Sequence, residues 1–255
     1  MHILRLECAP EDRDLLIAEL WERGTTGITE EDAVLQAFFE APFGTAQWER
    51  YHPRWEKAEE RDWIEVSREP WKPLLLGERF FLVPAWQDAP TPPGRLRIEM
   101  RPGLGYGTGW GEPTQLALEA IEKRLRPGAV VLDFGTGSGI LAVAAARLGA
   151  GRIYACDIDR EVAAAAQERF RDEGIGVGLF AGSIRSVRTA SIDFLAANIN
   201  AETLTGFASE ILRVLAPDGR AVLSGFPDRH LERLRAAFAN RGEVLVKGDW
   251  RALVW

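Results

Sequence analysis

The sequence predicts an α/β protein in which a mostly parallel sheet follows a small α+β N-terminal domain. From residue 130 onward, short β-branched runs alternate with segments of helical spacing, the pattern of a doubly wound sheet with right-handed crossovers. Two strand-like runs crowd together over residues 243–255 around a short Gly-Asp turn. We therefore expect a hairpin that adds a C-terminal antiparallel strand. Residues 1–46 contain a separate β-α-β-β pattern.

The elements of the N-terminal domain are predicted from the spacing of its apolar residues, which differs between strands and helix. Apolar residues alternate in the strand-like runs, whereas the helical run has apolar positions three and four residues apart and stops at Gly24. The expected elements of this domain are a strand at 2–8, a helix at 12–24, and strands at 27–29 and 34–39.

Residues 47–72 change in character, because charged residues and aromatics replace the apolar periodicity. We interpret this stretch as a helical linker that lays indole rings on a neighbouring surface. An alternative is that these tryptophans belong to the core of the small domain. The tryptophans concerned are Trp48, Trp55, Trp63 and Trp71.

The remaining residues, 73–255, are assigned to one large domain. Its first part has two strand-like runs around a Pro-rich turn, and regular alternation of strands and helices follows. Strands are expected at 79–86, 95–100, 130–134, 152–157, 178–181, 192–198, 220–225, 243–247 and 251–255. Helices are expected at 115–125, 202–215 and 228–239. Two more are expected between strands, one after the strand at 130–134 and ending at 148, the other after the strand at 152–157 and ending at 174.

Composition and charge narrow the class of protein. The chain has 255 residues, 46% hydrophobic and 27% charged, without a long apolar run or a signal-peptide layout. Cys8 and Cys156 are the only cysteines, so reduced thiols and a cytoplasmic location are expected. We expect no metal site and no membrane contact.

The charge of −7 is unevenly distributed. Residues 1–69 carry 17 acidic and 8 basic side chains, and the remaining residues carry 21 and 23. An acidic N-terminal part disfavours nucleic acid as a partner, because phosphates are neutralised by Lys and Arg. It is suited to a basic protein partner, or it is a solvated surface that aids solubility.

The strongest motif is VVLDFGTGSGIL at residues 130–141. Gly135, Gly137 and Gly139 stand between a predicted strand and a helix, where glycine allows a tight turn and close approach of a ligand. The Gly-x-Gly-x-Gly spacing differs from the dinucleotide fingerprint. Asp133 directly precedes the turn and Asp157 ends the next strand, where a carboxylate can accept hydrogen bonds from ribose hydroxyls.

These features favour S-adenosylmethionine as the ligand. A sulfonium cofactor has no pyrophosphate and needs no tight phosphate cradle, and its positive charge makes a carboxylate at Asp133 tolerable. The alternative is a purely structural turn with a capping Asp.

Asn198 ends the strand expected to lie beside the first one, at the rim where open α/β sheets bind ligands. Its side-chain carbonyl can accept a hydrogen bond from a substrate amine, although a lone Asn at a strand end is more often a turn residue. The loop RPGLGYGTGW at residues 101–110 is so rich in glycine that a ligand close to its backbone is expected.

The motifs together resemble those of the ribosomal protein L11 methyltransferases, the PrmA type. The resemblance extends over nearly the whole chain. It rests on RDWIEVSREPWKP, RFFLVPAW, GLGYGTG, DFGTGSGILA, ACDID, AANI and LAPDGRAVLSG. It implies a class I methyltransferase, Rossmann-like fold and an N-terminal domain that captures a large-subunit ribosomal protein.

The resemblance also implies a set of site residues. The loop GLGYGTG is expected to fold over the methionine end of the cofactor. Our own hypothesis for the reaction is that Asn198 orients the amine and that Tyr106 and Trp110 wall the methyl channel. The cofactor contacts that the resemblance implies are Thr114, Gly135, Asp157 and Asn198. Gly107, Thr108, Asp133 and Gly137 are further candidates for contact with the cofactor.

This chain departs from the family pattern where amine and methyl group should meet. Trp110-Gly111-Glu112-Pro113-Thr114 replaces a His followed by a Thr pair, and Asn200 replaces Leu or Tyr. The main hypothesis is methylation of lysine or N-terminal amines of a ribosomal protein by a monomer. The alternatives are another protein or a small amine as substrate, and a binding module without activity.

Overall fold

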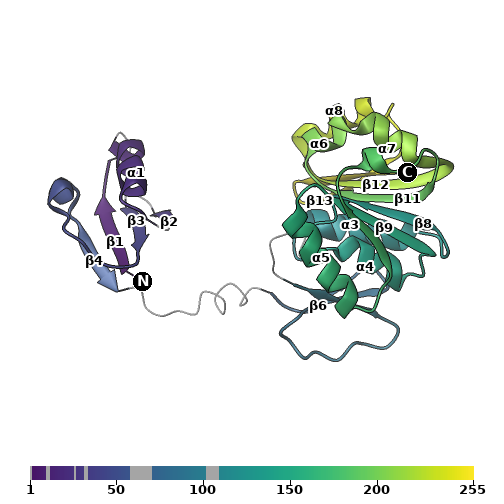
Figure 1. The fold of residues 1–255 in the computed structure, drawn as a ribbon, viewed down its shortest axis with the longest axis horizontal. Coiled ribbons are helices and arrows are strands. Elements are labelled where there is room, and N and C mark those ends of the chain that lie inside the picture. The colour runs from purple at the N-terminus through teal and green to yellow at the C-terminus, as the bar shows by residue number, and fades with distance from the viewer. Residues whose placement is uncertain (1, 10–11, 26, 32–33, 58–70, 102–108) are drawn as a thin grey trace. The chain divides into compact units, whose positions relative to one another are not determined.

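A computed structural model describes residues 2–9, 12–25, 27–31, 34–57, 71–101 and 109–255. The chain divides into two compact units, Met1–Pro70 and Trp71–Trp255, which are described separately (Figure 1). Within the described residues, no helix is long and apolar enough to cross a membrane.

The N-terminal unit is a four-stranded antiparallel sheet with one α-helix. Its strand order is β2 (Gly27–Glu31), β3 (Val34–Phe39), β1 (His2–Glu7) and β4 (Arg54–Lys57). Helix α1 (Arg13–Glu22) buries Leu16 and Leu20 in the same core as Leu4, Leu6 and Leu35 of the sheet. The expected β-α-β-β elements are confirmed, since alternation and helical spacing both place leucines on one buried face.

The first part of the expected helical linker belongs instead to this unit, so the boundary at residue 46 is corrected. Residues 46–51 form a 3₁₀ turn, η2 (Ala46–Tyr51), and β4 pairs antiparallel with β1, placing Trp55 opposite Leu4. The Trp48 indole N–H donates to Glu19 Oε2 at 2.6 Å, and the Trp55 N–H donates to the Phe43 carbonyl at 3.1 Å. Trp48 is buried in the core of this unit and packs on Phe43, as the alternative interpretation of these tryptophans expected. Trp55 is partly buried and packs on Phe39 and Phe43 at the edge of the same core.

The other two tryptophans of that stretch have different positions. Trp63 lies outside the described residues. Trp71 begins the second unit and packs on Trp86, with ring centroids 5.4 Å apart. The second unit therefore begins two residues before the expected position.

The second unit is built on a seven-stranded sheet (Figure 1). The strand order is β10 (Val177–Ala181), β9 (Arg152–Asp157), β8 (Val130–Phe134), β11 (Ile192–Asn198), β12 (Leu215–Pro227), β14 (Trp250–Val254) and β13 (Glu243–Lys247). The first five strands in this order, β10, β9, β8, β11 and β12, run parallel to one another. Strand β14 is antiparallel to both its neighbours, β12 and β13. This confirms the predicted mostly parallel sheet with a C-terminal antiparallel strand.

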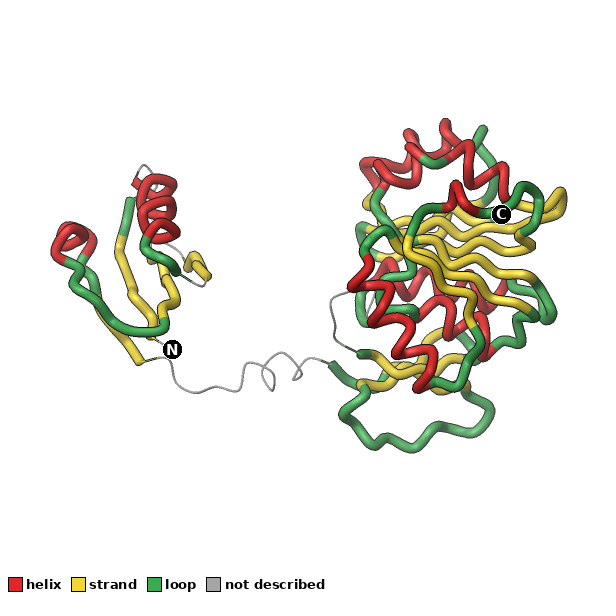
Figure 2. The backbone as a smooth tube through the Cα atoms, in the orientation of Figure 1, coloured by secondary structure: helices red, strands yellow, loops and turns green. Residues whose placement is uncertain are grey.

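Helices cover both faces of this sheet, as Figure 2 shows. One core holds residues of α3 (Glu112–Arg124), α4 (Ile140–Arg147) and α5 (Arg160–Asp172). The other holds residues of α6 (Ala201–Gly206), α7 (Ala208–Val214) and α8 (Leu231–Ala237). A sheet buried on both faces explains why its strands are almost continuous runs of apolar residues.

The strand expected at 220–225 extends over Leu215–Pro227, the short strand Leu74–Leu76 was not expected, and three helical segments differ from the sequence prediction. The helix expected at 202–215 is broken at Phe207, whose φ of −105° leaves the helical region. The last helix is preceded by a 3₁₀ turn, η4 (Asp228–His230). Helix α3 begins at Glu112 rather than 115, because Pro113 is well tolerated in a first helical turn.

A three-stranded sheet precedes these elements. Its order is β5 (Leu74–Leu76), β6 (Phe80–Pro84) and β7 (Leu96–Met100). Strands β6 and β7 run parallel, so the Pro-rich stretch between them is a crossover loop and not a tight turn. Buried residues of β6 and β7 share a core with α3 and α4, which places the end of β7 beside the glycine-rich turn.

We predict that Trp48→Ala destabilises the N-terminal unit by about 3–5 kcal/mol, because it leaves a large cavity in that unit's core. Hydrogen exchange of β1 and β3 amides measures this, with amides of β8 and β9 as an internal control. Trp48→Phe keeps most of the ring but loses the bond to Glu19, so a smaller cost of about 1–2 kcal/mol is expected. Unchanged exchange in Trp48→Ala would contradict the assignment of residue 48 to the core.

Candidate functional site

The turn between β8 and α4 lies at the carboxyl ends of the central strands. Gly135, Gly137 and Gly139 all have positive φ values, of 72°, 52° and 77°. A Cβ atom on Gly135 would lie 2.5 Å from Ile199 Cγ2, directly after β11. The turn therefore requires glycine both for its backbone conformation and for its close approach to the end of β11.

Asp157 is held at the tip of β9 by backbone donors. Its Oδ2 accepts from the Gly137 amide at 3.0 Å, and its Oδ1 accepts from the Asp159 amide at 3.1 Å. Asp159 in turn caps α5 by accepting from the Glu161 amide at 2.8 Å. Since a carboxylate offers about four acceptor positions, Asp157 keeps capacity for two further donors such as neighbouring hydroxyls.

Asp133 lies beneath the turn and is fully buried. Its Oδ2 accepts from Thr136 Oγ1 at 2.8 Å and from the Ala142 amide at 3.1 Å, while Oδ1 has no partner among the described residues. Burial, together with the nearby charge of Asp157, raises the pKa of Asp133 to about 7, although the two hydrogen bonds oppose this shift. Asp133 thus ties β8 to both ends of the turn.

Asn198 and Ser224 connect the strand ends to the start of α3. Asn198 Nδ2 donates to Thr114 Oγ1 at 3.0 Å, and Ser224 Oγ donates to the Pro113 carbonyl at 2.8 Å. Thr114 and Ser224 are buried. Asn198 Oδ1 is buried and has no partner among the described residues. An unpaired buried acceptor costs about 1–3 kcal/mol, so this atom is suited to accept a hydrogen bond from a bound group.

These residues surround a cleft of about 340 Å³ at the rim of the sheet. Asp157 and Asn198 both line it, at the ends of β9 and β11, the two strands that flank β8. Ile158, 80% exposed, offers an apolar surface beside Asp157. The cleft is lined by Phe134, Gly135, Gly137, Cys156, Asp157, Ile158, Asp159, Val162, Gly182, Asn198, Ile199, Asn200 and Thr203.

The hydrogen-bonding groups and apolar surface of the cleft fit S-adenosylmethionine. Asp157 offers acceptors for a ribose, the glycine turn allows backbone approach, and Ile158 presents an apolar face to a flat ring. The unpaired Asn198 Oδ1 supplies a further acceptor. A volume of about 340 Å³ lies within the usual range for small-molecule sites.

Four of the residues expected at the cofactor line the cleft, namely Gly135, Gly137, Asp157 and Asn198. Two others lie behind it, because Asp133 supports the turn from below and Thr114 reaches the cleft through its bond to Asn198.

The residues of the expected covering loop that the structure describes, Gly109 and Trp110, do not line the cleft. Tyr106, Gly107 and Thr108 lie outside the described residues. Gly109 is buried, and a Cβ atom there would lie 2.7 Å from Ile140 Cδ1. Trp110 is 37% exposed, its carbonyl accepts from Gln115 Nε2 at 2.7 Å, and it is not part of the cleft lining.

Arg169 of α5 is a structural residue that the sequence did not reveal. Although only 4% exposed, it donates to the carbonyls of Ser138 in the glycine turn, at 3.1 Å, and of Glu99 in β7, at 2.5 Å. Burial lowers its pKa to about 10, and Glu173 opposes this effect. Its spacing from Ala163 and Ala166 places residue 169 on the buried face of α5, but no local signal indicates that it joins two distant loops.

Comparison with known proteins gives a consistent result. The family model for ribosomal protein L11 methyltransferase (PrmA) matches residues 4–255. A Thermus thermophilus protein named ribosomal protein L11 methyltransferase is 34% identical, with 100% of this chain and 99% of that protein aligned. A Burkholderia mallei protein of the same name is 35% identical over 88% of this chain and 72% of its own length.

A solved structure supports the same relationship. The crystal structure of a ribosomal protein L11 methylase from Lactobacillus delbrueckii subsp. bulgaricus superposes with a TM-score of 0.65 at 32% identity. The match covers 72% of this chain and 96% of that one.

We predict that Asp133→Asn changes the pH dependence of stability. The pKa of this carboxyl is about 7 in the folded protein, against an ordinary value of 3.8, so the folded state retains the proton to a higher pH than the unfolded state. The stability it contributes is therefore present at low pH and is lost as the pH rises towards 7. Asn cannot ionise, so Asp133→Asn does not lose this stability. The free energy of unfolding of the variant minus that of the wild type should therefore increase by about 2–3 kcal/mol from pH 5 to pH 8.

Urea unfolding at several pH values measures this difference. Asp218→Asn, which changes an exposed carboxylate, is the matched control and should follow the wild-type curve. Parallel curves for Asp133→Asn and the wild type would contradict the prediction.

Proposed function

Because this chain belongs to the ribosomal protein L11 methyltransferase family, we propose that it methylates lysine or N-terminal amines of a large-subunit ribosomal protein in the cytoplasm. It is an S-adenosylmethionine-dependent methyltransferase with a class I fold. A small amine as substrate, or a binding module without activity, is not favoured by this family membership.

One observation carries the assignment of the site. A single cleft joins an oriented carboxylate, Asp157, to a buried amide oxygen without a partner, that of Asn198. In our proposal Asp157 holds the ribose of the cofactor, and Gly135 and Gly137 pass close to it. Gly107, Thr108 and Tyr106 are proposed to cover the methyl end, together with Trp110.

When bound, S-adenosylmethionine supplies a methyl group activated by a sulfonium. The residues of the site must hold the substrate's amine in its neutral form, with a free lone pair. A lysine at pH 7 pays about 4–5 kcal/mol for deprotonation, given its reference pKa near 10.4. The apolar walls at Phe134 and Ile199 remove water from the amine and so lower its pKa. Asn198 Oδ1 accepts one N–H of the amine and orients the nitrogen.

The N-terminal unit is proposed to capture the substrate protein. Residues 1–69 carry 17 acidic and 8 basic side chains, a charge that attracts a basic protein and repels nucleic acid. The catalytic unit has almost balanced charge, so it does not by itself attract a basic protein.

Asp157→Ala is predicted to weaken binding of S-adenosylmethionine by about 1–3 kcal/mol, because it removes charge-assisted hydrogen bonds. Titration calorimetry measures the affinity. Asp218→Ala, at an exposed carboxylate far along the sequence, is the control and should bind like the wild type. Wild-type affinity in Asp157→Ala would overturn the ribose assignment.

The function itself is tested with labelled S-adenosylmethionine and ribosomal proteins from a strain without this methylation. The wild-type chain should label one large-subunit protein. Asn198→Ala should lower kcat at saturating cofactor by about tenfold to a hundredfold, because the amine loses its orienting acceptor. Labelling of a non-ribosomal target, or of nothing despite cofactor binding, would disprove the proposed substrate.

A further inference from the structure

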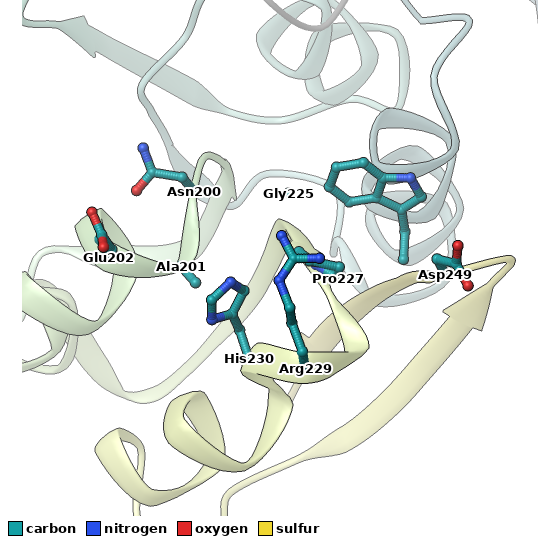
Figure 3. A pocket seen from close by; sticks show the side chains of 9 residues that line it. Asn200, Ala201, Glu202, Gly225, Pro227, Arg229, His230 and Asp249 are labelled. Atoms are coloured by element: carbon teal, nitrogen blue, oxygen red, sulfur yellow. The ribbon is translucent and has the colours of Figure 1, made fainter. Parts of the chain in front are cut away.

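A second hollow, of about 480 Å³, lies beside the cofactor cleft (Figure 3). It is formed by the first residues of α6, the end of β12, η4 and the turn between β13 and β14. Its lining residues are Asn200, Ala201, Glu202, Gly225, Pro227, Arg229, His230, Asp249 and Trp250. None of the residues that the sequence marked for the cofactor is among them.

The two hollows meet at the segment that follows β11. Asn200 lines both of them. Its Oδ1 caps α6 by accepting from the Thr203 amide at 2.8 Å, so its Nδ2 is the group left for a ligand. Gly225 has a φ of 96°, and a Cβ atom there would lie 2.6 Å from the Ile199 carbonyl oxygen. Residues 199 and 200 are therefore a thin wall between the cofactor cleft and the second hollow.

The second hollow presents charges of both signs. In Figure 3 the Arg229 guanidinium points into its middle, with Glu202 on one side and Asp249 on the other. Among the described residues, no hydrogen bond or ion pair engages the side chains of Arg229, Glu202 or Asp249. Glu112 lies against the same β13–β14 turn, since a Cβ atom on Gly248 would be 2.6 Å from its Oε2.

We propose that the second hollow binds the polypeptide segment flanking the amine that is methylated. This inference rests on the proposed function. A peptide offers carbonyls and carboxylates to Arg229 and Asn200 Nδ2, and N–H groups and cationic side chains to Glu202 and Asp249. The nearby carboxylates disfavour a polyanion such as RNA. A segment seated there reaches the cleft across residues 199 and 200, where the amine meets Asn198.

The test compares two charge reversals on neighbouring positions. Arg229→Glu places a carboxylate in the hollow. Arg233→Glu makes the same change on an exposed residue one turn further along, outside the lining. Because both variants alter the net charge equally, a difference between them reports the hollow itself rather than long-range attraction.

Steady-state kinetics with the free ribosomal protein and the full chain are the measurement. We expect Arg229→Glu to raise KM for the protein about tenfold, with kcat and the cofactor Kd within about twofold of the wild type. Arg233→Glu should change KM by less than about threefold. Thermal melting of both variants is expected to match the wild type, since Arg229 is exposed.

Equal KM values for the two variants would overturn the inference while leaving the proposed function intact. A cofactor Kd raised as much as KM in Arg229→Glu would also overturn it, by assigning the residue to the cofactor cleft. Absence of labelling by the wild-type chain would overturn the proposed function, and this inference with it.

Discussion

The arrangement of the site depends on one steric constraint, the position of Ile199 between two glycines. Gly135 and Gly225 approach it from opposite strands, and a Cβ atom on either would lie about 2.5–2.6 Å from Ile199 atoms. Both glycines have positive φ, so the same residues satisfy the backbone and the packing requirement. This contact positions Asn198 and Asn200 on either side of Ile199, and with them the walls of both hollows.

Buried hydrogen-bonding side chains hold the glycine turn around this contact. Asp133 accepts hydrogen bonds from Thr136 and Ala142, and Arg169 donates to Ser138 on the opposite side. Each group is costly to bury, which explains the raised pKa of Asp133 and the lowered pKa of Arg169. The hydrogen bonds hold the turn in one conformation, so little reorganisation of the turn is required when a ligand binds.

In our proposal the two neighbouring hollows have two different chemical tasks. The cleft beside Asp157 has an apolar surface and few acceptors, which suits a nucleoside and a desolvated amine. The neighbouring hollow carries Arg229, Glu202 and Asp249 and suits a polypeptide. Asn200, where this chain departs from the pattern of the family it resembles, lines both hollows.

The sequence by itself determined the α/β class, the antiparallel C-terminal strand and four of the residues that line the cleft, because hydrophobic period and glycine spacing are local properties. It misassigned residues 47–57, since a strand and a 3₁₀ turn with two tryptophans resemble an amphipathic linker until β4 pairs with β1. Only the tertiary structure decided that Arg169 joins two loops, that Ser224 holds Pro113, and that Arg229 faces Asn200 across a hollow. These relationships join residues far apart in the chain, and long-range packing leaves no periodic signal in the sequence.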